Sequence, residues 1–313
     1  MGYPTFMRVP LFSGSDRKAI QLAFWVGQLN AITGSEIPKI RHGCILGEIK
    51  ARSTSIFSQV SNEQSLRLSP SAVSEYENCP QQYKYRKIDK LPEPPSLDAE
   101  RGTLVHTVLQ DLFEIPAAGR TIESAIELLP SRWSAQLADK PALLEMVTNE
   151  KEWLDRASAL VRTYFTLENP TTFDATHREM HLENDFDTNV YLHGYVDRLD
   201  VAATGEVRIV DYKTGKAPKP GWEEKALFQL RVYALLYWKN NGVLPRLLQL
   251  IYLGDGKLVK SNPTMAELEV TEKVLHRVAK DIFISIEKEY WPAKPSRLCD
   301  WCYFKSICPA HSN

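Results

Sequence analysis

Asp197, Asp211 and Lys213 are spaced so that a β-hairpin would bring their charged groups together. Two β-rich runs, 190–201 and 206–212, flank a short turn-forming segment. The two aspartates lie symmetrically about that turn, so a regular hairpin makes them cross-strand neighbours about 5 Å apart at Cβ. Asp211 and Lys213 are two apart on one strand and leave from the same face. Two carboxylates this close repel each other unless a cation lies between them, and the spacing therefore predicts a divalent metal site beside Lys213.

Each of these residues also has an ordinary structural explanation. Asp197 could pair with a neighbouring arginine, and Asp211 could form an exposed strand ion pair with Lys213. Against this, Ile209 and Val210 directly precede Asp211 in a run that should be a buried strand. A charge directed into such a setting needs partners or a metal.

His106 stands four residues after Gly102, so in a helix the two residues share one face. Glycine in a helix interior costs roughly 1 kcal/mol relative to alanine. Its presence would let a ligand or another backbone segment approach the imidazole. Taken alone, His106 is better explained as an ordinary polar residue at the edge of a core helix.

Four of the five cysteines form a pattern typical of metal ligands. Cys299, Cys302 and Cys308 lie within ten residues, and Cys79 stands far upstream. Four thiolates suit both zinc and a [4Fe–4S] cluster, and either would tie together segments that are distant in the chain. The remaining cysteine, Cys44, is expected to be a spare thiol.

The motifs taken together resemble the RecB-like exonuclease branch of the PD-(D/E)XK nuclease superfamily. The resemblance covers about residues 67–311. It rests on Gly102-Thr-Leu-Val-His106, Gly194-Tyr-Val-Asp197, Asp211-Tyr-Lys213-Thr-Gly215, Gln229-Leu-Arg-Val-Tyr233, and Cys79 with the three-cysteine cluster, in the family's order.

The resemblance implies roles for individual residues. It implies a catalytic metal bound by His106, Asp197, Asp211 and the carbonyl of Tyr212. Carboxylate and carbonyl oxygens suit Mg²⁺, and an imidazole shifts the preference toward Mn²⁺. Lys213 would orient the attacking water and offset negative charge in the transition state.

Secondary positions are implied in the same way. Gln229 would lie by the active site and Tyr233 near the DNA backbone, although a structural hydrogen bond and a core aromatic explain them equally. Glu179 matches an acidic position of the family, but its neighbours suit a plain surface strand equally well. The order of one cysteine before the nuclease core and three after it favours [4Fe–4S] over zinc.

The implied protein is a metal-dependent DNA exonuclease of repair or recombination, acting on single strands or DNA ends, with a structural [4Fe–4S] cluster. The implied fold is α/β: a restriction-endonuclease-like core, in which helices flank a small mixed sheet, with a helical insertion and an iron–sulfur clasp. The chain lacks a GxxxxGK[ST] phosphate loop, so unwinding would need a separate helicase. Two alternatives stay open: a non-catalytic DNA-end-binding subunit and a CRISPR-adaptation-type nuclease.

Composition agrees with a globular cytoplasmic enzyme. The 313 residues are 43% hydrophobic and 25% charged, with a net charge of −1, which opposes indiscriminate DNA coating. No apolar run reaches the ~20 residues of a membrane helix, and no secretory signal is apparent. Local basic runs occur at 84–90 and 213–219.

The elements expected to position these residues follow from periodicity and turn signals. Residues 1–66 are expected to form a flexible or loosely docked extension, and residues 67–313 the nuclease domain. A helical insertion is expected at 121–166, punctuated by Pro130 and Pro141, and the C-terminal cysteine segment at 291–311. Helices are expected at about 97–114, 150–165, 222–240 and 265–290, and strands at 176–185, in the hairpin and at 246–253.

Overall fold

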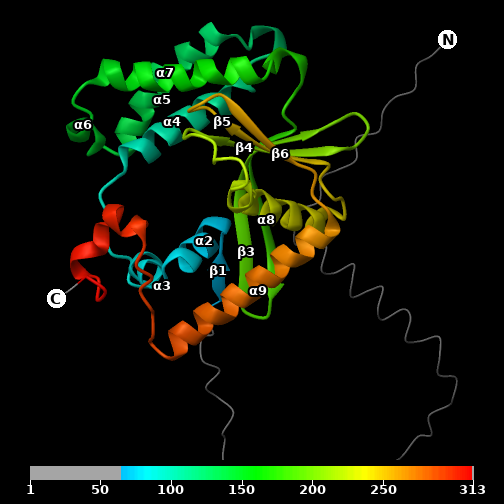
Figure 1. The fold of residues 1–313 in the computed structure, drawn as a ribbon. Coiled ribbons are helices and arrows are strands. Elements are labelled where there is room, and N and C mark those ends of the chain that lie inside the picture. Colours follow the sequence, from blue (N-terminus) through cyan, green and yellow to red (C-terminus); the bar gives the residue numbers. More distant parts are fainter. Residues whose placement is uncertain (1–64, 312–313) are drawn as a thin grey trace, which may run out of the picture. The chain divides into compact units, whose positions relative to one another are not determined.

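The computed structural model describes residues 65–311 (Figure 1). The expected extension over residues 1–66 falls almost wholly outside them, and so does Cys44. The described strands are β1 Leu66–Leu68, β2 His177–Asp187, β3 Val190–Val201, β4 Val207–Lys213, β5 Leu247–Tyr252 and β6 Lys257–Ser261. The α-helices are α2 Pro70–Asn78, α3 Pro80–Tyr83, α4 Leu97–Leu112, α5 Ile122–Asp139, α6 Leu143–Met146, α7 Glu150–Leu167, α8 Glu223–Asn241 and α9 Met265–Glu287.

The strands form one mixed sheet in the order β1-β3-β4-β5-β6, with β2 paired to β3. The predicted hairpin is present as antiparallel β3 and β4. Strand β5 runs parallel to β4, and α8 makes the crossover that a parallel pair requires. Strands β1 and β6 were not expected from the sequence; one is only three residues long and the other is half exposed.

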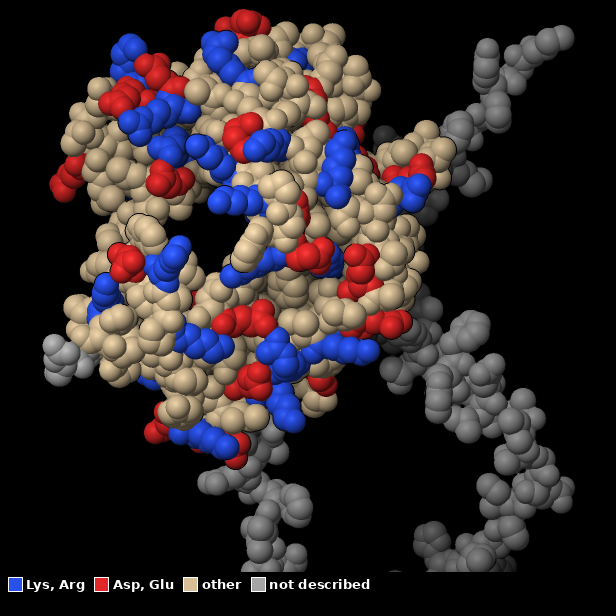
Figure 2. Space-filling model, viewed as in Figure 1, with Lys and Arg blue, Asp and Glu red and all other residues tan. Residues whose placement is uncertain are grey.

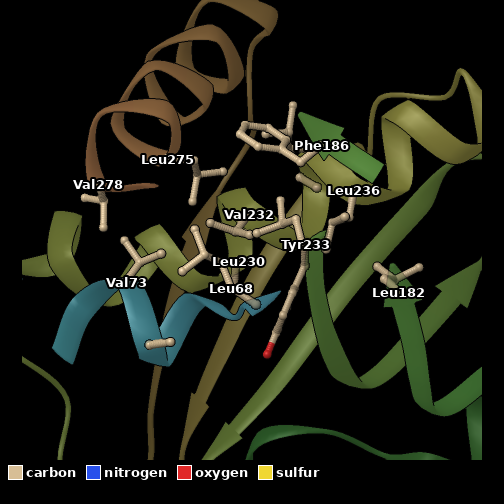
Figure 3. Close-up of a cluster of buried hydrophobic side chains, with 14 of the residues drawn as sticks. Leu68, Val73, Leu182, Phe186, Leu230, Val232, Tyr233, Leu236, Leu275 and Val278 are labelled. Carbon is tan, nitrogen blue, oxygen red and sulfur yellow. The ribbon is translucent and has the colours of Figure 1, made fainter. Parts of the chain in front are cut away.

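Two apolar clusters lie on opposite faces of this sheet. The first packs α2, α8 and α9 against β3, β4 and β5, and Figure 3 shows its side chains converging between α9, α8 and the strands. The second packs α4, α5 and α7 onto Val210, Tyr212 and Ile251. The sheet is therefore buried on both faces near β4, as an α/β fold requires.

The expected helical insertion forms helices α5, α6 and α7, of which α5 and α7 pack on α4 (Figure 1). One detail of the prediction is wrong. Pro130 does not interrupt the helix but lies inside α5. The buried side chains of Leu129 and Trp133 hold both halves of α5 against the core, which offsets the hydrogen bond that proline removes. Pro141 does separate α5 from α6.

A buried cluster of charged groups joins the helical insertion to the sheet. The Arg198 side chain is 1% exposed. Its guanidinium donates to the Tyr212 hydroxyl at 2.6 Å and pairs with Glu168, at the end of α7, at 2.8 Å and with Asp200 at 3.1 Å. Arg208 completes the cluster by pairing with both acids. Two positive and two negative charges thus balance where a lone charge would be costly.

Over residues 65–311, no helix combines the length and the apolar composition that crossing a bilayer demands.

Candidate active site

Strands β3 and β4 part at Asp197. The ladder pairs Arg198 with Val210, so the same register places Asp197 opposite Asp211, as the symmetry of the hairpin predicts. The bond from Ala202 N–H to the Glu206 carbonyl shows that even-numbered β3 residues form the hydrogen-bonded pairs. Continuing that alternation would pair Val196 with Tyr212. Instead, the Tyr212 N–H donates to the Asp197 carboxylate at 2.7 Å.

Strands β2 and β3 also change their orientation at this point. Before it, Leu182 and Val196 pack into the cluster with α8. After it, Arg198 reaches Tyr164 of α7 on the opposite face. The register places Glu179 of β2 opposite Asp197, and Glu179 has φ 46°, a conformation that costs a non-glycine residue roughly 1–2 kcal/mol. The two acids therefore lie where both strands turn over.

Helix α4 brings His106 to these acids. Its Nδ1 lies 3.4 Å from Asp197 Oδ2. Among the residues that the structure describes, His106, Glu179 and Asp197 are the three potential metal ligands whose donor atoms all lie within 4.8 Å of one another. At Gly102, one turn earlier, an added Cβ would meet the Thr214 hydroxyl at 3.4 Å. That distance is an ordinary van der Waals contact, so the contact with Thr214 does not by itself require glycine at this position.

Asp211 and Lys213 form a second group directly beside the first. Lys213 Nζ lies 2.6 Å from Asp211 Oδ2 and donates to Gln229 Oε1 at 2.8 Å. The Gln229 amide donates in turn to Asp211 Oδ1 and to the Tyr233 hydroxyl, both at 2.8 Å. Gln229 thus fixes the acid and the amine of the Asp-x-Lys pair from helix α8.

Gly194 explains how Tyr233 reaches this group. A Cβ at Gly194 would lie 2.5 Å from the Tyr233 ring, so only glycine allows the ring to pass across β3. Figure 3 shows the Tyr233 hydroxyl directed away from the apolar side chains around its ring. The glycine of Gly194-Tyr-Val-Asp197 therefore positions a side chain of α8.

The electrostatics of the site match a place built for a cation. Burial and the charge of Asp197 raise the pKa of Asp211 to about 6, despite Lys213 and His106. Burial and Asp197 also raise the pKa of Glu179. Burial alone would lower the pKa of His106, but the hydrogen bond and charge of Asp197, with Asp211 and Glu179, raise it overall. Excess negative charge in a buried place favours protons or a metal.

The donor set fits a divalent cation. One imidazole and two carboxylates suit Mn²⁺ or Mg²⁺. Glu179, which the sequence ranked as secondary, belongs to the compact donor group, whereas Asp211 stands beside it in its pair with Lys213. In the sequence, Glu179 was indicated only by its resemblance to an acidic position of the family. The irregularity of β2 that turns its side chain inward occurs at Glu179 itself, without a glycine or proline that would have predicted it.

The four predicted cysteine ligands meet in one place. Cys79 lies between α2 and α3, and the other three lie in short helices at Arg297–Trp301 and Tyr303–Ile307 or at their ends. All four line one small cavity. The Gln82 amide donates to Cys302 Sγ at 3.7 Å and the Ser296 N–H to Cys299 Sγ at 3.4 Å. The donor chemistry thus fits a thiolate-bound metal centre, with hydrogen bonds to two of the sulfurs.

A separate cavity of about 680 Å³ lies between α2, α8 and α9, lined by residues such as Glu77, Lys225 and Arg231. Neither Glu179 nor Asp197 lines this cavity. Although a large cavity is often the first candidate for a binding site, the convergent ligands and shifted pKa values favour the β3–β4 opening as the candidate site.

One protein family and several known proteins are similar to most of this chain. The model of the PD-(D/E)XK nuclease superfamily matches residues 67–309. Gene 69 protein of Mycobacterium phage D29 is 27% identical over 271 residues, which cover 77% of this chain and 96% of the phage protein. Gene 69 protein of Mycobacterium phage L5 is 24% identical over 288 residues, with coverage of 77% and 95%. A solved structure of a candidate exonuclease from Eubacterium rectale is similar with a TM-score of 0.48 and 13% identity, over 83% of this chain and 95% of that one.

Proposed function

The chain belongs to the PD-(D/E)XK nuclease superfamily, and on that premise we propose that it is a metal-dependent DNA exonuclease. One observation carries the proposal: the His106–Glu179–Asp197 donor group stands directly beside the Asp211–Lys213 pair. The first group can bind a divalent cation, and the second adds an acid and an amine for the reaction. The RecB-like order of the motifs supports exonuclease action in repair or recombination.

The residues of this chain would divide the work as follows. His106, Glu179 and Asp197 would hold the cation, with Asp211 as a further ligand. The Tyr212 N–H faces Asp197, and because N–H and C=O of one strand residue point to the same edge, its carbonyl faces the same opening. A bound divalent ion would polarise the scissile phosphate and lower the pKa of a water molecule.

Lys213 would orient the attacking water and offset negative charge as it develops on the phosphate. Gln229 would keep the Lys213 ammonium in place, because the Gln229 amide oxygen accepts a hydrogen bond from Lys213 Nζ while the Gln229 amide nitrogen donates to Asp211. The Tyr233 hydroxyl accepts a second hydrogen bond from the Gln229 amide nitrogen and so helps to fix the orientation of that amide. The chain thereby supplies a positioned amine next to the cation ligands.

For the cysteines we propose a [4Fe–4S] cluster that clasps the C-terminal segment to α2 and α3. All four cysteines line one cavity, and four thiolates suit both zinc and a [4Fe–4S] cluster. The RecB-like order, with one cysteine before the nuclease core and three after it, supports the cluster. The Tyr85 hydroxyl also donates to the Ile307 carbonyl at 2.9 Å, so the clasp joins segments that already touch.

DNA contact is supported by local charge. On the side of the molecule that Figure 2 shows, Lys and Arg side chains surround a gap in the surface and are interspersed with acids rather than forming one positive field. The loop after β4, which carries Lys216 and Lys219, continues directly from the Asp211–Lys213 pair. Such local patches suit an enzyme that must release its product. Any unwinding would come from a separate helicase.

The test compares linear and circular single-stranded DNA, labelled and incubated with Mn²⁺ or Mg²⁺. We expect linear DNA to be degraded and circular DNA to survive, because an exonuclease needs an end. Asp211→Asn and Lys213→Met should abolish cleavage while DNA binding persists. Lys257→Met is the matched control, because Lys257 pairs with Asp255 at an exposed position.

Several results would overturn parts of the proposal. Cleavage of circles would replace exonuclease with endonuclease action. If the wild-type protein binds DNA but does not cleave it with either metal, the non-catalytic DNA-end-binding subunit would be favoured instead. For the clasp, anaerobically purified protein should contain iron and sulfide, and Cys299→Ser should remove both; stoichiometric zinc in their place would decide against the cluster.

A further inference from the structure

A row of aromatic rings runs along β3 toward the candidate active site. Tyr191, His193 and Tyr195 alternate with buried residues and so share one face of the strand. The Tyr191 and His193 rings are stacked with centroids 6.3 Å apart. His181 of the neighbouring β2 stacks on Tyr195 at 4.6 Å with an interplanar angle of 25°. The four rings form a continuous patch, which we call the aromatic row.

The end of the aromatic row nearest the His106–Glu179–Asp197 donor group is accessible, whereas Tyr191 and His193 are half-buried. Tyr195 is 53% exposed, and His181 is exposed as well. Asp197 follows Tyr195 by two residues on β3, and Glu179 precedes His181 by two residues on β2, so the row leads to the point where both strands turn over. Side chains two residues apart on a strand are separated by about 6.6 Å, so the row extends about 20 Å from Asp197 to Tyr191.

Positive charge accompanies the rings. The Arg67 guanidinium lies 4.5 Å over the Tyr191 ring. Arg67 and Lys87 both lower the pKa of His193, after the larger effect of burial and together with His181, so both cations lie near the row. One acid intervenes: Glu183 accepts a hydrogen bond from the Tyr191 hydroxyl and lies 3.5 Å from His181. Its charge is thus engaged within the row.

Cross-strand ring pairs can simply stabilise a hairpin, by roughly 0.2–1 kcal/mol each. That role does not require the rings to stay uncovered or to continue to the catalytic carboxylates. Aromatic rings on an open sheet face beside basic groups are, by contrast, how single-stranded nucleic acids are bound, with bases stacked on rings and phosphates near cations.

We propose that the aromatic row is a base-stacking track that guides single-stranded DNA into the candidate active site. This inference rests on the proposed nuclease function and adds to it the surface that would hold the unpaired bases of a single strand. Tyr195 and His181 would stack the base nearest the metal-type donors, and Arg67 and Lys87 would contact the backbone farther out. Binding would show little sequence preference, because every base has a π-face.

The experiment measures binding in the Asp211→Asn background, so that the probe survives. The probes are a fluorescein-labelled oligothymidylate of about twelve nucleotides and an abasic strand of the same length. Tyr195→Ala should weaken binding of oligothymidylate roughly tenfold or more, the range of one lost base–ring stack. Tyr195→Phe, which keeps the ring, should bind within about twofold of the parent, as should Tyr290→Ala, which removes a tyrosine that is 67% exposed at the end of α9.

The abasic strand checks both the fold and the mechanism. It should bind more weakly than oligothymidylate to the parent and equally to parent and Tyr195→Ala, because it has no base to stack. Equal binding of the two probes by the parent, or unchanged oligothymidylate binding by Tyr195→Ala, overturns the track. Wild-type protein is also assayed for hydrolysis of thymidine 5′-p-nitrophenyl phosphate, a small ester that needs the metal site but no track. Hydrolysis of this ester without the expected binding differences would show that the track is wrong while the nuclease function stands.

Discussion

The Asp197 carboxylate accepts a hydrogen bond from the Tyr212 N–H at 2.7 Å, fifteen residues later in the chain. It occupies the place that a backbone carbonyl of β3 would hold if the ladder continued. The carboxylate therefore has two roles: it satisfies a backbone donor where the strands part, and it faces His106 and Glu179. The Asp197 carboxylate thus lies in the opening between β3 and β4 and bonds to its edge.

These two roles of Asp197 should separate on substitution. Asp197→Asn keeps an oxygen that can accept from the Tyr212 N–H, so we expect the free energy of unfolding to change little while Mn²⁺ affinity falls. Asp197→Ala leaves that N–H without its acceptor and should cost a further ~1–3 kcal/mol. Chemical denaturation and calorimetric Mn²⁺ titration measure the two effects. Equal stability of the two variants would show that the carboxylate does not hold the strands apart.

Glu179 stores backbone strain at the same place. Glycine adopts φ 46° without penalty, so Glu179→Gly should stabilise the metal-free protein by about 1 kcal/mol while lowering Mn²⁺ affinity at least tenfold. Lys90→Gly is the matched control, since Lys90 has φ 51° but is not in the donor group. It should stabilise similarly and leave Mn²⁺ affinity unchanged. Destabilisation by Glu179→Gly would mean that its side chain contributes more to the fold than its conformation costs.

The metal-free site should make the protein less stable as pH rises. Folding raises the pKa values of Asp211, Glu179 and His106, so the folded state binds more protons than the unfolded state and stability falls with pH. For Asp211, whose pKa rises from 3.8 to about 6, the loss is at most about 3 kcal/mol, spread between those values. For His106 the loss begins near its unperturbed pKa of about 6.5 and continues above it.

Melting temperatures at pH 5 and pH 8, in protein freed of divalent metal, measure this effect. We expect the higher value at pH 5, and a larger stabilisation by Mn²⁺ at pH 8, because the ion replaces the protons. Asp211→Asn should flatten the dependence. A metal-free protein that is more stable at pH 8 would contradict the raised pKa values.

The sequence predicted those features of the site that depend on local geometry. The pairing of Asp197 with Asp211 follows from their symmetry about a turn, and side-chain alternation places Lys213 with Asp211. The inward turn of Glu179 was not predictable, because it depends on a left-handed conformation that β2 adopts only when packed against β3. The approach of His106 likewise depends on how α4 packs, and only the resemblance of the motifs indicated it.

Arg198 links the helical insertion to the strands that carry the acids. Its loss should therefore lower the stability of the fold and weaken the metal site. Removing one partner of a buried ion pair typically costs about 3–5 kcal/mol, so Arg198→Met should destabilise strongly. Arg208→Met, at a side chain 26% exposed, should cost less. Glu168→Gln combined with Arg198→Met should cost less than the sum of the single changes, because Arg198→Met leaves an excess buried negative charge and Glu168→Gln removes it.

The same variant should also affect the metal site. Arg198 directly follows Asp197 and donates to the hydroxyl of Tyr212, whose backbone holds the Asp197 carboxylate. We therefore expect Arg198→Met to weaken Mn²⁺ binding at temperatures where the protein is still fully folded, measured by calorimetry alongside Arg208→Met. Unchanged affinity in folded Arg198→Met protein would confine the role of Arg198 to stability, because the strands would then keep their separation without it.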